Sequence, residues 1–205
     1  MDLLVISIAA DIVPITGENR VMAFYGLQQL NDHPRIGLQA LLNVAGKKNQ
    51  INISDVVFGL APRINAAGRI GHGKKAVEML IQSDPEKAQE KAHYINEHNL
   101  IRKELDQQIT KEALGMIVSN AKSTVVFHPD WHKGVIGIVA SRLIESHYRP
   151  TIVLTESKGM ITGSARSVMG FDVYDAIDAC SELIEQFGGH KYAAGLTLKK
   201  ENLEA

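Results

Sequence analysis

Residues 83–117, "SDPEKAQEKAHYINEHNLIRKELDQQITKEALGMI", place the strongest constraint on what this chain can fold into. Asp84 and Pro85 are typical of a helix start, because the aspartate can cap free N–H groups and proline suits the first helical position. Apolar residues recur at helical spacing, at positions 88, 92, 95, 105, 109 and 113. The pattern predicts one helix of on the order of 50 Å, at about 1.5 Å rise per residue. We expect so long a helix to connect two domains and to expose its polar middle, at 98, 99, 102 and 103.

The composition allows one or two ordinary hydrophobic cores and excludes several classes of protein. The 205 residues are 45% hydrophobic and 22% charged, and the single cysteine, Cys180, excludes an internal disulfide framework. No apolar run reaches the roughly 18 residues of a membrane span, and the N-terminus lacks the basic flank of a signal peptide. We therefore expect a cytoplasmic protein with no membrane partner. The net charge of −1 means that any binding of nucleic acid depends on a local basic patch or on metal ions.

The first region is expected to begin with a buried strand. "LLVISIAA" (3–10) is a short continuous apolar run, as in a parallel sheet, and Asp11 follows it directly. A carboxylate at the carboxyl end of such a strand stands where open α/β sheets bind their ligands. The alternative for Asp11 is a helix cap or a turn. Helices are expected at 16–30 and 38–45.

A glycine-rich turn with two arginines is expected next. A helix that begins at Ser54 should end at Pro62, which places "APRINAAGRIGHG" (61–73) in a turn. Arg63 and Arg69 there present rigid forks that suit phosphate oxygens. The alternative is that each arginine holds the loop by donating to backbone carbonyls.

The residues after 119 alternate between strand and helix patterns, which predicts a second, α/β domain. Strands are expected at 124–128, 151–155, 159–167 and 193–199, with helices at 134–146 and 174–186.

Two pairs of residues in this second domain are candidates for binding phosphate. Ser164 and Arg166 are two apart on a predicted strand, so the alternation of a strand turns both side chains to one face. A hydroxyl and a guanidinium fork can then converge on one phosphate group, unless the pair lies on a solvated face. His132 and Gly134 precede a helix whose free N–H groups can receive an anion.

The segment "FGGHKYAAG" (187–195) places a histidine where there are almost no side chains. Gly188 and Gly189 lack a Cβ atom and let a ligand approach the main chain closely. His190 could donate to a phosphate oxygen there, or it could be a hydrogen-bonded structural histidine.

In this order, the motifs resemble the RecJ family of single-strand-specific exonucleases, in the DHH/DHHA1 phosphoesterase superfamily. "ADIVP" (10–14) is similar to the fourth metal-binding motif of the DHH domain, and "PRINAAGR" (62–69) to a RecJ signature. "DWHKGVIGIVASRL" (130–143), "GSARS" (163–167) and "FGGHKYAAG" are similar to the DHHA1 domain. The resemblance covers practically the whole chain. It implies the C-terminal, mostly helical part of a DHH domain (1–83), a long connecting helix (84–119) and an α/β DHHA1 domain (120–205).

The resemblance also implies roles for individual residues. Asp11 would be a ligand of a catalytic Mn²⁺ or Mg²⁺, and Asp11 and His190 would be catalytic. The 5′-terminal phosphate of single-stranded DNA would bind Ser164 and Arg166. The path of the strand, in a cleft between the domains, would be lined by Gly188, Gly189, His190, Arg63, Asn65, Arg69 and, more weakly, His132. The implied activity is 5′→3′ hydrolysis of phosphodiester bonds in DNA repair and recombination, with a single-strand-binding protein or a helicase as partner.

The chain departs from the family in one respect. It contains neither a DxD pair of aspartates nor the Asp-His-His triplet that names the catalytic domain. Divalent ions of this kind take about six ligands, so one carboxylate cannot hold such an ion for catalysis. We therefore expect a fragment that is inactive by itself on 5′-phosphorylated single-stranded DNA with Mn²⁺.

Two other functions fit part of the pattern. Another DHH-type phosphoesterase, acting on oligonucleotides or cyclic dinucleotides, would share Asp11 and the glycine-histidine motif. "PRINAAGR" and the long helix favour a RecJ-like protein over it. A non-catalytic nucleic-acid-binding protein would fit the missing metal-binding motifs.

Overall fold

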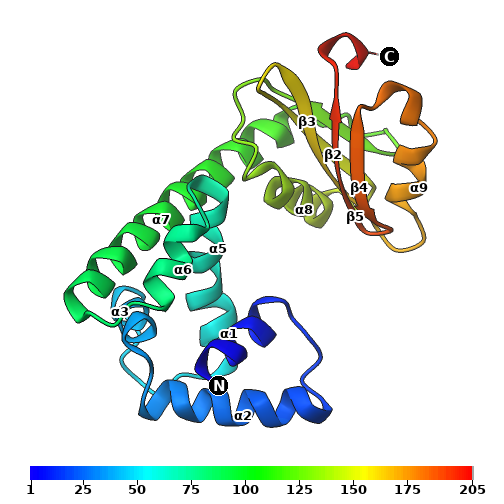
Figure 1. The fold of residues 1–205 in the computed structure, drawn as a ribbon. Coiled ribbons are helices and arrows are strands. Elements are labelled where there is room, and N and C mark those ends of the chain that lie inside the picture. The colour runs from blue at the N-terminus through cyan, green and yellow to red at the C-terminus, as the bar shows by residue number, and fades with distance from the viewer. Residues whose placement is uncertain (205) are drawn as a thin grey trace. The chain divides into compact units, whose positions relative to one another are not determined.

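The computed structural model describes residues 1–204 and divides the chain into two compact units, Met1–Arg102 and Lys103–Ala205. The division falls inside the long helix α7 (Pro85–Gly115), so each unit contains part of it (Figure 1). This helix confirms the prediction over 83–117. Asp84 caps it as expected, because its Oδ1 accepts hydrogen bonds from the N–H groups of Glu86 and Lys87.

The middle of α7 fits the expectation of an exposed polar face only in part: Lys103 is exposed, and His98 and Arg102 are half-buried. Asn99 is fully buried, and its Oδ1 accepts a hydrogen bond of 3.2 Å from Arg102. A polar side chain can lie in the interior where a neighbour supplies a hydrogen bond, and helical periodicity does not reveal that neighbour.

The first unit is entirely helical within the described residues. Its core gathers large buried side chains from six elements, including Leu30, Leu41, Leu60, Met79 and Ile95. The elements that precede α7 are α1 (Asp2–Ala10), α2 (Gly17–Asp32), α3 (Ile36–Val44), α4 (Ile53–Asp55), the π-helical turn η1 (Val56–Leu60), α5 (Ala61–Ile70) and α6 (Lys74–Leu80).

Residues 3–10 form helix α1, so the prediction of a strand was wrong. Both Val5 and Ile8 are buried, as are Ile6 and Ala9, so the helix is covered on more than one side. A short continuous apolar run does not by its pattern distinguish a helix from a buried strand. Asp11 therefore follows the C-terminus of a helix, where its N–H donates to the carbonyl of Ser7. It does not stand at the end of a sheet strand.

The segment 61–73 is mostly helix α5, so the predicted turn was also wrong. Pro62 lies in the first turn of α5, and the π-helical turn η1 runs directly into it. Pro62 has no N–H to donate, and it follows directly on the π-helical turn, where the regular pairing of each N–H with the carbonyl four residues earlier is interrupted. The helical run begins at Asn52 instead of Ser54: the Asn52 side chain accepts from the N–H of Asp55, and the Asp55 carboxylate accepts from the N–H of Asn52.

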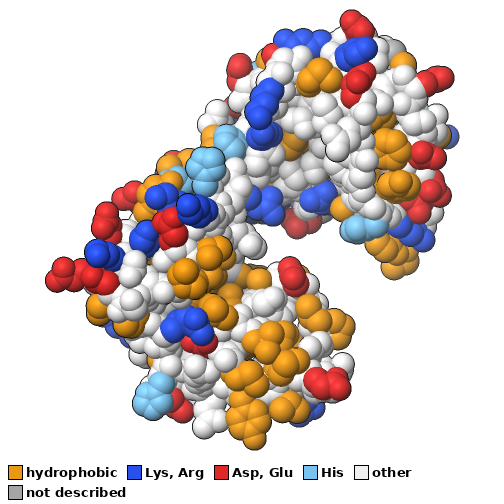
Figure 2. Space-filling view, in the orientation of Figure 1, with side chains coloured by type: hydrophobic (Ala, Val, Ile, Leu, Met, Phe, Trp, Pro, Cys, Tyr) orange, Lys and Arg blue, Asp and Glu red, His pale blue; other side chains and the backbone are white. Residues whose placement is uncertain are grey.

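Hydrophobic side chains gather on the surface of the first unit over α1 and α2 (Figure 2). Ile12 is 80% exposed and Phe24 is 65% exposed, and Val21 and Tyr25 are each 54% exposed. No helix within residues 1–204 is long and apolar enough to cross a membrane.

The second unit is built around a five-stranded sheet with the strand order β1-β2-β3-β5-β4. The sheet confirms the predicted α/β class. Strands β1 (Thr124–Phe127) and β2 (Thr151–Ser157) are parallel, and α8 (Ile136–Ser146) connects them. The remaining pairs are antiparallel and involve β3 (Met160–Arg166), β4 (Gln186–His190) and β5 (Ala193–Leu198).

The predicted helix over 174–186 is much shorter in the structure. Helix α9 covers only Val173–Asp178, a 3₁₀ turn η2 follows at Ser181–Leu183, and β4 begins at Gln186. The Gly-Gly-His motif therefore lies on an edge strand of the sheet. A short 3₁₀ turn, η3 (Lys200–Asn202), follows β5.

Candidate functional site

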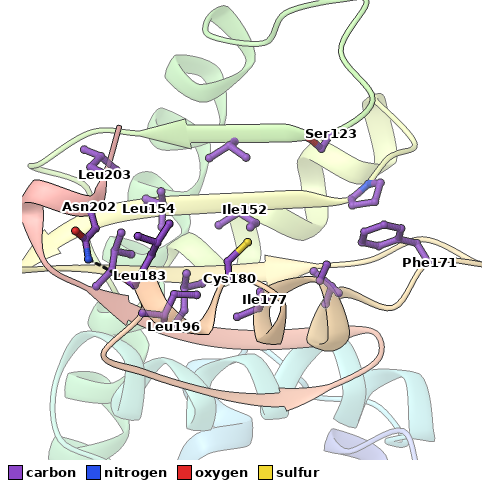
Figure 3. Close-up of a pocket in the computed structure, with 16 residues that line it drawn as sticks. Ser123, Ile152, Leu154, Phe171, Ile177, Cys180, Leu183, Leu196, Asn202 and Leu203 are labelled. Atoms are coloured by element: carbon purple, nitrogen blue, oxygen red, sulfur yellow. Dashed lines mark hydrogen bonds between the residues drawn. The ribbon is translucent and has the colours of Figure 1, made fainter. Parts of the chain in front are cut away.

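The two faces of the sheet have different chemistry. On one face, Leu154, Ile161 and Leu196 pack with α9 in a hydrophobic core. Beside this core lies a cavity of about 400 Å³ whose walls are almost entirely apolar, with Ile152, Leu183 and Cys180 among them (Figure 3). The cavity offers no charged group, so we place the candidate site on the opposite face.

The opposite face carries four of the sequence-predicted residues, Ser164, Arg166, Gly188 and His190, in ordered rows. Directly paired residues of antiparallel strands point to the same side, so the registers of β3, β5 and β4 define three rows. The arginine row contains Arg166, Ala193 and His190; the glycine row contains Ser164, Gly195 and Gly188; the threonine row contains Thr162, Thr197 and Gln186.

Ser164 and Arg166 are brought together as the alternation predicts. The Nη1 of Arg166 donates to the Oγ of Ser164 at 3.0 Å and to the carbonyl of Ala165 at 2.7 Å. Both side chains are half-buried, so the guanidinium is held in place on the sheet. A pre-positioned hydroxyl and guanidinium form a grip suited to a phosphate group.

The first turn of α8 lies directly against this pair. A Cβ atom at Gly137 would be 3.0 Å from the Oγ of Ser164 and 3.1 Å from the Nη2 of Arg166, so only glycine allows this approach without a shift. Within residues 1–204, the backbone N–H groups of Ile136 and Gly137 have no hydrogen-bond acceptor. Free N–H groups at a helix N-terminus favour an anion, so the helix adds donors to the grip.

His132 and His190 each accept a hydrogen bond through Nδ1. The donors are the N–H of Gly134, at 3.1 Å, and the N–H of Tyr192, at 3.2 Å. An accepting Nδ1 in a neutral imidazole puts the proton on Nε2. Both rings therefore have a structural hydrogen bond and an Nε2–H that can donate. His190 is exposed at the end of β4, on the same face as Arg166.

The two glycines before His190 have different structural roles. Gly189 has a φ of +152°, and its Cβ would lie 2.3 Å from the carbonyl oxygen of Ala193, so the fold itself requires glycine. Gly188 is exposed, and no atom lies within 4 Å of the position its Cβ would take. Only Gly188 therefore leaves open surface that a ligand can use.

Arg63, in the first unit, forms hydrogen bonds that hold parts of the fold together. Its Nε donates to the Oδ1 of Asn96 on α7 at 2.9 Å, and its Nη1 donates to the carbonyl of Gly59 at 2.7 Å. Burial lowers the pKa of the Arg63 guanidinium from its usual value. The sequence also allowed Arg63 to hold the chain by donating to backbone carbonyls. The structure fits this alternative, because Arg63 connects η1 and α5 to α7.

The other candidates of the first unit are exposed. Asn65 and Arg69 lie four residues apart on α5, so they share one face of that helix. Asp11 is exposed after α1. Within residues 1–204, no group of three or more His, Cys, Asp or Glu side chains could hold a metal ion, so these residues do not form a complete site for Mn²⁺ or Mg²⁺.

Sequence reasoning missed Gly137, the free N–H groups of α8 and the threonine row. Gly137 stands in "KGVIGIV", and a glycine near a helix start is a weak signal for close approach. The threonine row depends on the pairing of β3 with β5 and of β5 with β4, which no local pattern specifies.

Comparison with known proteins shows what this chain is similar to. Residues 116–205 match the DHHA1 domain family. The chain is 40% identical over 209 residues to the single-stranded-DNA-specific exonuclease RecJ of Bacillus subtilis, covering 99% of this chain and 27% of that protein. Crystal structures of RecJ from Thermus thermophilus in complex with Mg²⁺ and with Mn²⁺ superpose with TM-scores of 0.90 and 0.89, each at 32% identity. Each match covers 98% of this chain, and 32% and 30% of those chains.

Proposed function

This chain is a RecJ-like sequence that contains a DHHA1 domain, and from this premise we propose that it is part of a 5′→3′ single-stranded-DNA exonuclease of DNA repair and recombination. It spans about a quarter of the length of its Bacillus subtilis relative. The role that we assign to this part is to hold the 5′ end of the strand.

One observation carries the proposal: Ser164, Arg166 and the first turn of α8 converge on one place. Arg166 supplies a charged fork and Ser164 a hydroxyl, and Gly137, whose N–H has no acceptor within residues 1–204, lies against both. A terminal phosphate carries more negative charge than an internal phosphodiester and has more free oxygens. A grip of several donors therefore selects a strand end over the middle of a strand.

The hydrolytic step requires groups that this chain does not supply in full. The RecJ structures that it resembles contain Mg²⁺ or Mn²⁺. Asp11 is our candidate for one carboxylate ligand, with His190 as a candidate catalytic group. Because the described residues do not assemble a metal site, the chain alone is predicted to be inactive as a nuclease. A cytoplasmic location and a single-strand-binding protein or helicase as partner also stay predictions.

The test compares strands that differ only at the 5′ end. A 3′-labelled single strand with a 5′-phosphate should bind the 205-residue chain at least about tenfold more tightly than the same strand with a 5′-hydroxyl. Arg166→Gln should remove this preference, because the neutral amide loses the charge and the fork. Lys122→Gln, which removes one charge from an exposed residue of the same unit, should retain it. Equal affinity of the wild-type chain for the two strands would refute the proposal.

A further inference from the structure

A second polar feature lies on the same sheet face, beyond the residues that grip the phosphate. The threonine row crosses β3, β5 and β4 on the face that carries Ser164 and Arg166. Its three side chains, together with Gly188 and Gly195, border a shallow hollow of about 310 Å³. Helix α8 packs on β2 and β3. On β4 and β5, Gln186, Gly188 and Gly195 of this face are exposed.

The side chains of the threonine row can form further hydrogen bonds. Within residues 1–204, neither the amide of Gln186 nor the hydroxyl of Thr197 has a partner. The hydroxyl of Thr162 makes one long bond, 3.4 Å, to the carbonyl of Leu196. Three neutral groups that donate and accept suit phosphodiester and sugar oxygens, which a protein contacts without reading the base sequence.

The spacing separates this row from the phosphate grip. Thr162 lies four residues from Arg166 on β3, about 13 Å along the strand, and two residues from Ser164, about 7 Å. A phosphate group held by both Arg166 and Ser164 lies toward the arginine row, so it does not also reach Thr162. Gly188 and Gly195 lie between the arginine row and the threonine row and carry no side chain, so an extended strand can lie close to the sheet over that distance.

We propose that the threonine row binds the sugar–phosphate backbone of the nucleotides that follow the terminal phosphate. The strand would run along β5 from the arginine row to the threonine row. This inference rests on the proposed function, because that function fixes where the 5′ end lies. It adds that the DHHA1 unit holds several nucleotides and not the end alone.

The experiment uses two ligands, 5′-phosphorylated thymidine mononucleotide and 5′-phosphorylated thymidine tetranucleotide, in NMR titrations of the 205-residue chain. The double variant Thr162→Val/Thr197→Val removes two hydroxyls and retains β-branched side chains that suit a strand. It should bind the tetranucleotide about tenfold more weakly and leave mononucleotide affinity unchanged. Gln186→Met is a second variant that should also weaken binding of the tetranucleotide and leave mononucleotide affinity unchanged. Thr16→Val, at an exposed threonine whose side chain makes no cap hydrogen bond, is the matched control.

The outcomes separate the two claims. If the threonine variants bind the tetranucleotide like the wild type, or weaken both ligands equally, the inference is wrong while the phosphate grip stands. If the wild-type chain binds neither ligand, or if Arg166→Gln weakens neither, the proposed function fails and the inference fails with it.

Discussion

Gly188 and Gly189 show how two identical neighbours differ once the sheet forms. The sequence motif suggests that both glycines let a ligand approach the main chain. In the structure, the φ of Gly189 and its contact with Ala193 make it a requirement of the β4–β5 pairing, whereas Gly188 faces open space. A motif can therefore combine one residue retained for folding with one available for binding.

Gly189→Ala should lower the free energy of unfolding by about 2–4 kcal/mol, because a Cβ there meets backbone atoms and the backbone conformation disfavours a side chain. Gly188→Ala, the matched control, should change it by less than about 1 kcal/mol. Urea denaturation of both variants measures the difference. Equal losses would contradict the roles that we assign to these residues.

At the scale of elements, α1 is anchored by a buried carboxylate. Asp2 is fully buried; its oxygens accept hydrogen bonds from the N–H of Leu3 and from the backbone and guanidinium of Arg35, at 2.9 to 3.2 Å. Burial raises the pKa of Asp2, but the hydrogen bonds from Arg35 and Leu3 outweigh it, and the pKa lies below its usual value.

A lowered carboxylate pKa makes stability depend on pH with a definite sign. The contribution of Asp2 is fully present above its unfolded pKa of about 3.9, and it is lost as the pH falls through the lower folded value. Thermal unfolding of the first unit should thus show a larger difference between wild type and Asp2→Asn at about pH 7 than at about pH 3. Asp32→Asn, at an exposed carboxylate, should show no such change. A difference that is independent of pH would rule out the ion pair as its source.

At the scale of the whole molecule, long and periodic patterns were predictable and buried or long-range features were not. The α7 helix, the strands β1, β2, β3 and β5, and the pairing of Ser164 with Arg166 on one face follow from local periodicity. The helical state of 3–10 and of 61–70 could not be predicted, because burial on several sides and a π-helical turn before Pro62 depend on tertiary packing. The same is true of Gly137 and the threonine row, which depend on how α8 and β5 dock.

The central claim is that one grip, made by Ser164, Arg166 and the start of α8, holds a terminal phosphate. A crystal structure of this chain with a 5′-phosphorylated dinucleotide tests it most directly. We predict that the terminal phosphate lies within hydrogen-bonding distance of the Oγ of Ser164, the guanidinium of Arg166 and the N–H of Gly137. A dinucleotide bound elsewhere on the second unit, with its terminal phosphate out of reach of Ser164 and Arg166, would contradict the account.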